Sequence, residues 1–142
     1  MGKNTTFSSS LLALIFNASA IAGLAQNNAT SPLTNLYAAL HTADPGATGN
    51  QSTSEATYTG YARVAVSRST AGWTVTSNSV SPAGTISFPA CSGGSNTITN
   101  FSIGTASSGT GSILYSGTVS PNISVASGVT PQLTTASTIT ES

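Results

Sequence analysis

The spacing of apolar residues changes near residue 33 of the chain. Before this point, apolar residues recur at the three- and four-residue spacing of a helix: Leu11, Leu14, Ile15, Ala18, Ile21, Ala22 and Ala25. The hydroxyl groups of residues 8–10 can cap its start, and Gly23 with Asn27 and Asn28 marks its end. We therefore expect a helix over residues 11–25, within an N-terminal arm of residues 1–32 that precedes a β-domain of residues 33–142.

The expected helix is apolar around most of its circumference, because Leu12 and Phe16 widen the stripe. A helix of this kind has to be buried on more than one side, and a small β-domain covers only one. We expect the remaining surface to form an assembly interface with another subunit. The candidate interface residues are Leu11, Leu12, Ile15, Phe16, Ile21 and Leu24.

From residue 33 onward, apolar and polar residues alternate, and turn residues interrupt the pattern about every 8–12 residues. Strands are expected at Leu36–Thr42, Tyr61–Val66, Trp73–Val75, Ile86–Phe88, Phe101–Ile103, Ile113–Val119, Ile123–Val125 and Leu133–Ile139. About eight short strands of this kind predict a mainly β fold. We expect an antiparallel, jelly-roll-like β-sandwich with an N-terminal α-helix, and a partly open barrel is the alternative.

Three of the connections carry recognisable turn or loop signals. Ala43-Asp44-Pro45-Gly46 has Pro and Gly at turn positions, and the Asp44 side chain can cap the turn. Residues 50–57 are polar and predict a surface loop, and residues 127–128 (Ser-Gly) predict a hairpin.

The first 25 residues also imitate a secretory leader, with Lys3, an apolar run and an Ala18-Ser19-Ala20 motif. Asn-x-Ser/Thr triplets occur at Asn4, Asn17, Asn28, Asn50, Asn100 and Asn122. Such triplets arise by chance in a chain so rich in Ser and Thr, and one lies inside the apolar run, where a glycan would not be tolerated. We therefore favour the helix and keep a secreted adhesin as a third interpretation. The apolar run is shorter than the roughly 20 residues of a membrane span, so no membrane partner is expected.

Charge is scarce, since only 4% of the residues are charged and the formal net charge is zero. A typical soluble domain is about 25% charged. Without a basic excess the chain is not expected to bind nucleic acid, and a net charge near zero favours contact between copies. The six charged side chains are Lys3, Arg63, Arg68, Asp44, Glu55 and Glu141.

Few residues could perform chemistry. His41 and Cys91 are the only residues of their types, no nucleophile elbow or phosphate-binding loop occurs, and the acids are scattered. We expect no enzyme, no catalytic residue, no metal site and no cofactor, with His41 a strand-end residue that is hydrogen-bonded locally. Trp73 is expected in the core, although an exposed Trp73 or Tyr61 could instead anchor a glycan.

The chain has two arginines, and each has two interpretations. Arg63 and Arg68 could form polar contacts between subunits, as salt bridges or carboxylate clamps. Alternatively, they are solvated charges at strand edges that discourage unwanted pairing, which is the interpretation we favour.

Five segments together resemble a family of small tailed-bacteriophage virion proteins that often carry the label "phage tail fibre protein". The segments are Leu36–Gly46, Gly60–Val66, Ile86–Pro89, Phe101–Gly104 and Ile113–Gly117. The resemblance spans most of the chain, and the Leu-Tyr…His-Thr-Ala-Asp-Pro-Gly segment is its most specific part. It implies a β-sandwich structural protein of the virion, with no catalytic residues.

Two virion roles follow from this resemblance. A fibre normally has a long shaft repeat and a separate tip, and neither is visible here, so a capsid decoration (cement) protein is the leading interpretation. Such a protein would be a homo-oligomer, with a trimer favoured, that stabilises the major capsid protein lattice at the capsid surface after assembly in the host cytoplasm. A tail or tail-fibre component that contacts the host surface is the alternative.

Overall fold

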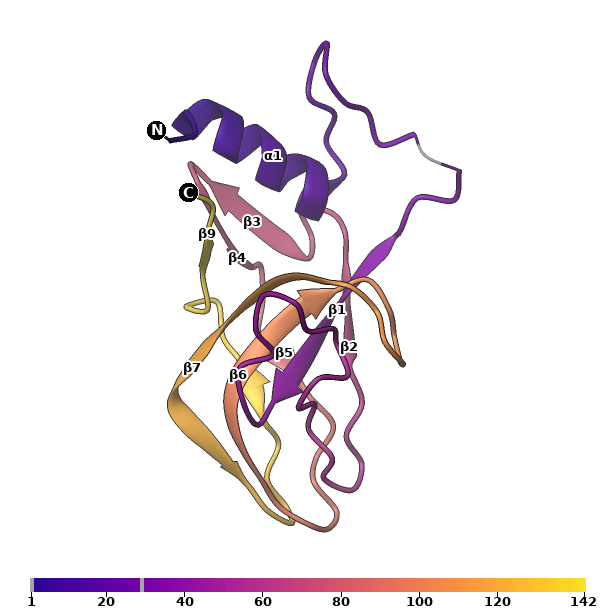
Figure 1. Cartoon of the computed structure of the whole chain (residues 1–142), viewed down its shortest axis with the longest axis vertical. Coiled ribbons are helices and arrows are strands. Elements are labelled where there is room, and N and C mark those ends of the chain that lie inside the picture. The colour runs from indigo at the N-terminus through magenta and orange to yellow at the C-terminus, as the bar shows by residue number, and fades with distance from the viewer. Residues whose placement is uncertain (1, 29) are drawn as a thin grey trace. The chain divides into compact units, whose positions relative to one another are not determined.

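A computed structural model describes residues 2–28 and 30–142 (Figure 1). The described residues form one helix and nine strands: α1 (Thr5–Asn17), β1 (Asn35–His41), β2 (Val64–Ser67), β3 (Trp73–Thr76), β4 (Ser79–Pro82), β5 (Ile86–Ser87), β6 (Asn96–Gly104), β7 (Ile113–Val125), β8 (Gln132–Leu133) and β9 (Ile139–Thr140). The expected mainly β class with an N-terminal helix is confirmed.

The strands form three separate sheets. Their strand orders are β2-β1-β6-β7, β3-β4-β9 and β5-β8, and none of these sheets closes into a barrel within the described residues. Pairing is antiparallel between β1 and β6, β6 and β7, β3 and β4, and β4 and β9, as expected. A jelly roll has eight strands in two sheets, so the division into three sheets is a finding that the strand pattern did not predict.

The described chain forms two compact units. The first, here called the helical unit, contains residues up to Asn35, Ser67–Thr85 and Leu133–Ser142. The second, the sheet unit, contains Leu36–Val66 and Ile86–Gln132. The expected arm of residues 1–32 includes positions 1 and 29, which lie outside the described residues, and its separation from a domain of residues 33–142 stays a prediction.

Helix α1 begins and ends earlier than expected. Asn4 is its N-cap and accepts a hydrogen bond from the Thr6 N–H at 2.8 Å, which is the role that Asn side chains favour. Residues 8–10, which the sequence predicts as caps, continue the helix instead, and the Ser10 hydroxyl donates back to the Thr6 carbonyl. Ala18, in the left-handed conformation with φ 56°, ends the helix.

The early end of α1 corrects the placement of two candidate interface residues. Ile21 and Leu24 lie beyond the helix, in a tight turn closed by hydrogen bonds between Ile21 and Ala25. Leu24 is 75% exposed there, whereas Leu12 and Phe16 are fully buried. The six residues therefore do not form one face of a helix, and their role in assembly stays a prediction.

The core of the helical unit is apolar. Helix α1 packs against β3 and β4 (Figure 1), and the Phe16 ring meets the Trp73 ring edge to face with centroids 4.8 Å apart. Leu12 and Val80 are buried in the same unit. The prediction that Trp73 is a core residue is confirmed, since its exposed fraction is 1%.

The four-stranded sheet of the sheet unit has two chemically different faces. Leu40 pairs with Phe101 and Ala38 with Ile103, so alternation places these buried apolar side chains on one face. The other face carries the intervening residues, most of which are small or polar: Ala39, His41, Asn100, Ser102 and Gly104, with Tyr37 and Ile98 as the larger exceptions. Because β1 and β6 are buried on both faces here, the polar face has to satisfy its own hydrogen bonds.

Most expected strands are present, and β7 and β2 differ mainly in their bounds. Strand β2 begins at Val64 instead of Tyr61, and β7 joins two expected strands into one of 13 residues. Strand β4 was not predicted, because Ser79-Val80-Ser81-Pro82 has a single aliphatic residue and a proline.

The C-terminal segment is divided where one strand was expected. Residues 133–139 contain the end of β8 and the start of β9, separated by a turn in which the Thr134 hydroxyl accepts from the Ala136 N–H. The turn at Ser127-Gly128 exists, with Gly128 at φ 89°, but β8 pairs with β5 and not with β7. The predicted hairpin at this turn is therefore wrong.

Candidate functional site

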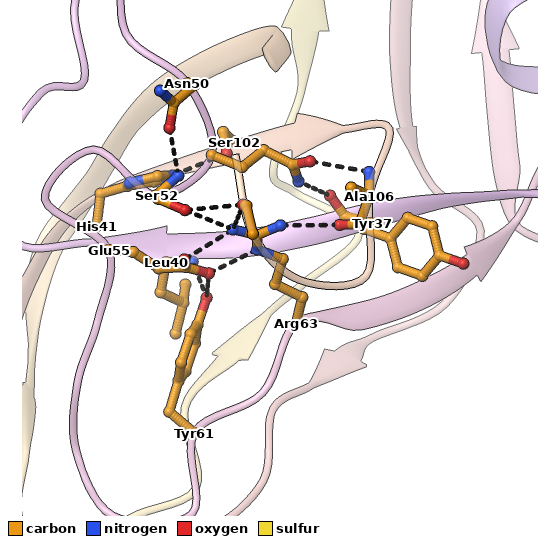
Figure 2. A network of polar contacts seen from close by, with 12 residues as sticks. Tyr37, Leu40, His41, Asn50, Ser52, Glu55, Tyr61, Arg63, Ser102 and Ala106 are labelled. Atoms are coloured by element: carbon orange, nitrogen blue, oxygen red, sulfur yellow. Dashed lines mark hydrogen bonds and ion pairs between the residues drawn. The ribbon is translucent and has the colours of Figure 1, made fainter. Parts of the chain in front are cut away.

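Buried polar side chains are concentrated in the sheet unit. The described residues that are both polar and buried are Ser8, His41, Gln51, Asn100 and Ser102. All but the first belong to the sheet unit, and Arg63 with Glu55 lies beside them (Figure 2). We call these six residues the polar network: His41, Gln51, Glu55, Arg63, Asn100 and Ser102.

His41 lies at the centre of the polar network and is fully buried. Its Nδ1 lies 2.8 Å from the Thr53 carbonyl oxygen, which can only accept, so Nδ1 carries the proton. Its Nε2, 2.8 Å from the Ser102 hydroxyl oxygen, then accepts a hydrogen bond from that hydroxyl. Burial lowers the pKa of His41 below its usual value, against smaller opposing effects of Thr53 and Glu55, which favours this neutral form.

The Ser102–His41 pair resembles the nucleophile and base of a hydrolase in its atoms and spacing. Both side chains have an exposed fraction of 0%, however, so no substrate atom can reach the hydroxyl. The pair therefore joins β1 and β6 to the 50–57 loop. His41 lies at the end of β1 as predicted, but the prediction of local hydrogen bonds is wrong, because Thr53 and Ser102 are 12 and 61 residues away along the chain.

Gln51 fills the space above two glycines. Its side chain is fully buried, its Oε1 accepts from the Ala106 N–H at 2.9 Å, and its Nε2 donates to the Tyr37 carbonyl at 3.4 Å. A Cβ atom added at Gly104 or at Gly111 would lie 2.2 Å from the Gln51 side chain. The prediction of a surface loop over residues 50–57 is therefore wrong at Gln51, which is a core residue of the sheet unit.

Arg63 joins two loops through a carboxylate clamp within the chain. Its Nε donates to Glu55 Oε1 at 2.6 Å and its Nη2 to Glu55 Oε2 at 2.8 Å, which is a bidentate pair. The same guanidinium donates to the Ala106 carbonyl at 3.0 Å (Figure 2) and to the Gly109 carbonyl at 2.6 Å. Hydrogen bonding to Glu55 raises the pKa of Arg63, and the side chain is only 2% exposed.

These contacts correct the interpretation of Arg63 as a solvated edge charge. The carboxylate clamp considered for a subunit interface exists, but its carboxylate is Glu55 of the same unit. Tyr61 completes the cluster: its hydroxyl donates to Glu55 Oε1 at 2.9 Å and accepts from the Leu40 N–H at 3.1 Å. Burial raises the pKa of Tyr61 strongly.

Arg68 also forms hydrogen bonds within its own unit, the helical unit. Its guanidinium donates to the carbonyls of Leu14 and Ile15, each at 2.6 Å, and to Asn27 Oδ1 at 2.6 Å. Carbonyls of the last helical turn lack partners within a helix, and a cation satisfies them well. Arg68 therefore caps the C-terminal end of α1, which neither interpretation from the sequence included.

The residues considered for ligand binding or reactivity pack against, or form hydrogen bonds with, other parts of the chain. Trp73 is buried, and the Tyr61 ring stacks on Phe88 with an interplanar angle of 11°, so neither is an exposed glycan anchor. Cys91 is 2% exposed and its Sγ donates to the Gly93 carbonyl at 3.1 Å. Across residues 2–28 and 30–142, no group of three or more His, Cys, Asp or Glu residues is placed to hold a metal ion.

Several of the Asn-x-Ser/Thr asparagines are part of the folded structure. Asn4 caps α1, Asn50 accepts from the Ser52 N–H at 2.9 Å, and Asn100 is 7% exposed.

In the part of the chain that the structure describes, no helix is both long enough and apolar enough to cross a membrane.

The polar network fixes the positions of two loops. Gln51, Ser52 and Arg63 all bind the segment between β6 and β7, since the Ser52 hydroxyl donates to the Gly109 carbonyl at 2.7 Å. Residues 107–110 of that segment (Ser-Ser-Gly-Thr) remain exposed. The network therefore holds an exposed, uncharged loop on a rigid base, and it has the character of a scaffold and not of a reaction centre.

The sequence contained one overlooked signal for this network. Asn100 and Ser102 alternate with Phe101 and Ile103, which is the pattern of a strand with one polar and one apolar face. Gln51 and Glu55 carried no such signal, because polar residues between strands ordinarily lie in solvent.

Comparison with known proteins supports a fibre role. No curated protein matches the chain. A family model described as Podophage GP4 fiber I protein gp80 matches residues 12–140, which covers all of the sheet unit and most of the helical unit. The resemblance to fibre-labelled virion proteins is thus confirmed, and the fibre interpretation is favoured over capsid decoration. The chain belongs to the family of the podophage GP4 fiber I protein gp80, a family of structural fibre proteins of the phage virion.

Proposed function

We propose that this protein is a structural subunit of a phage tail fibre and that it contacts the host surface through uncharged loops. The match to a fiber protein family over residues 12–140 carries the proposal. It replaces the leading expectation of a capsid decoration protein, and it retains the expectation of a homo-oligomer without enzymatic activity.

The use of the charged side chains supports a structural role. Lys3 pairs with Glu141, Arg63 with Glu55, Arg68 caps α1, and Asp44 Oδ1 accepts from the Gly46 N–H at 2.9 Å. Each of the six charged side chains thus has a partner within its own unit. Groups that are bound in this way are poorly available as acids, bases or ligands for a substrate.

The exposed loops of the sheet unit suit contact through hydrogen bonds. Residues 107–110 are exposed Ser, Gly and Thr, and the 42–48 loop is exposed apart from Pro45. Hydroxyl and backbone groups can bind neutral polar surfaces such as glycans, and contact of this kind depends little on salt. The Arg63 and Gln51 bonds hold the 107–110 loop in place before binding, which lowers the entropy lost on contact.

The location in the particle tests the fibre assignment. Gold-labelled antibodies against the chain, applied to purified particles, are expected to mark the fibres by electron microscopy. A uniform coat of label over the capsid would contradict the assignment.

Adsorption tests the host contact separately. An excess of the purified protein is expected to slow adsorption of the phage to its host, and to do so equally at low and high salt. The variant Ser107→Lys/Ser108→Lys should compete less well, whereas Thr74→Lys/Thr76→Lys, on exposed residues of β3, should compete normally. No competition by the wild type, with label still on the fibres, would refute the host contact and leave the fibre assignment standing.

A further inference from the structure

Strand β7 forms an open edge of the four-stranded sheet. It is the last strand in the order β2-β1-β6-β7 and pairs with β6 on one side (Figure 1). With 13 residues it is the longest strand described. An edge strand presents a row of backbone N–H and C=O groups that can pair with another chain.

The middle of this edge lacks the usual protection against such pairing. Natural edge strands are commonly short, or carry Lys or Pro, or are covered. The sequence of β7, ILYSGTVSPNISV, contains no charged residue, and its only proline is Pro121. The segment from Ile113 to Ser120 is therefore uncharged and free of proline, and its pairing with β6 is regular over residues 115–118, between two irregularities of the register.

The apolar face of the sheet is incompletely covered at this edge. Phe101 and Ile103 of β6 are buried, and β7 pairs with them through Gly117 and Tyr115. The apolar side chains of β7 on that side, Tyr115 and Val119, are only half-buried. Apolar surface that is half-exposed at a sheet edge is surface that an added strand could cover.

We propose that the open edge of β7 pairs with β7 of a second copy of this chain. A second copy suits the edge because the strand is uncharged and the chain has zero net charge, so nothing repels an identical partner. A two-fold axis brings identical strands together antiparallel, which is the pairing this sheet already uses. Pairing of β7 with β7 matches two strands of 13 residues, whereas pairing of β7 with β2, the other edge of the sheet, would match 13 residues with four.

The interface does not depend on where in the particle the chain lies. It places self-association on β7 instead of on the N-terminal residues suggested by the sequence. Two-fold pairing also gives dimers or assemblies of dimers, in contrast to the trimer favoured from the sequence.

Charges placed on the edge test the proposal. Ser116 and Thr118 are exposed in β7, so Ser116→Lys/Thr118→Lys adds two charges without entering the core. The matched control Thr74→Lys/Thr76→Lys adds the same charge on two exposed residues of strand β3. In sedimentation equilibrium the wild type and the control are expected to have the mass of a dimer or an even multiple, and the edge variant the mass of a monomer.

Other masses would overturn the proposal. These are a monomeric wild type at its highest soluble concentration, a threefold mass, or an edge variant that associates as the wild type does. If the edge variant does not fold, amide hydrogen exchange on the wild type gives an independent test. Amides of residues 113–120 are expected to exchange more slowly in concentrated than in dilute solution, and concentration-independent exchange there would also refute the pairing.

Discussion

The two units of this protein hold their interiors together by different means. The buried residues of the helical unit are mainly apolar, with Phe16 against Trp73. In the sheet unit, one face of the central sheet is apolar, while the other is occupied by His41, Gln51 and Ser102. Arg68 of the helical unit caps a helix, whereas Arg63 of the sheet unit lies in a nearly closed cluster with its carboxylate.

The two kinds of interior differ in how precisely they fix the positions of the segments around them. Burial of apolar area is not directional, so the helical unit needs a good fit of α1 onto β3 and β4 and little more. Hydrogen bonds fix distances and angles, and in the sheet unit they fix the 107–110 loop relative to β1 and β6. The polar network therefore fixes the geometry of the exposed loop that it supports.

The largest loss of stability is expected from Arg63→Met. It leaves the Glu55 carboxylate, which is 18% exposed, and the half-buried Ala106 carbonyl without the Arg63 donor, and it breaks the bond to the exposed Gly109. Removal of one partner of a largely buried pair costs about 3–5 kcal/mol. The free energy of unfolding from urea titration measures the loss. Lys3→Met is the control, because Lys3 is 29% exposed and its pair with Glu141 is worth about 0–1 kcal/mol. Equal losses in the two variants would contradict the special position of Arg63.

A loss of similar size is expected from Phe16→Ala in the helical unit. Removal of a buried aromatic ring costs about 3–5 kcal/mol. Trp73 is the only tryptophan, so its fluorescence should shift to longer wavelength as water reaches the ring. Phe7→Ala changes the same residue type in the same helix where the side chain is 40% exposed, and we expect little change in either measurement. An unchanged Trp73 spectrum in Phe16→Ala would argue against the packing of α1.

A smaller loss is expected from Gly104→Ala. Its added methyl group would overlap the buried Gln51 side chain, and overpacking of this kind costs about 1–3 kcal/mol. Gly84→Ala meets no atom within 4 Å and is the control. Because the clash involves one side chain, Gln51→Ala in the same molecule should recover part of the loss. Additive effects of the two substitutions in urea titration would contradict the contact.

The smallest effect is a pH dependence that His41 confers. Its pKa is lowered in the folded state, so below the unfolded value of about 6.5 the unfolded chain binds a proton that the folded chain does not. Stability is therefore fully present above pH 6.5, falls as the pH drops below it, and levels off below the folded pKa. Since His41 is the only histidine, His41→Gln should flatten the dependence between about pH 5 and 6.5. A dependence that persists in this variant would assign it to another group.

Local patterns in the sequence were enough to predict several elements. Alternation predicted β1 and the burial of Trp73, and turn chemistry predicted that Asp44 caps its turn. The existence of α1 followed from apolar spacing, but its ends depended on whether Asn4 or a later serine formed the cap. Equivalent capping groups within one segment leave the start of a helix undecided.

The polar network could not be predicted, because it depends on contacts between distant segments. Gln51 is buried only because Gly104 and Gly111 leave room for its side chain. Arg63 and Glu55 are eight residues apart, yet the carbonyls that complete their site belong to residues 106 and 109. A polar residue in a connecting segment gives no local sign that a distant part of the chain will cover it.

The number of copies in each virion tests the central claim, a structural role in a fibre, most directly. Quantitative mass spectrometry of purified particles, with the major capsid protein as internal reference, gives this number. The account predicts a handful to a few dozen copies per particle, as for a component of the tail. Hundreds of copies, in constant proportion to the capsid protein, would contradict it.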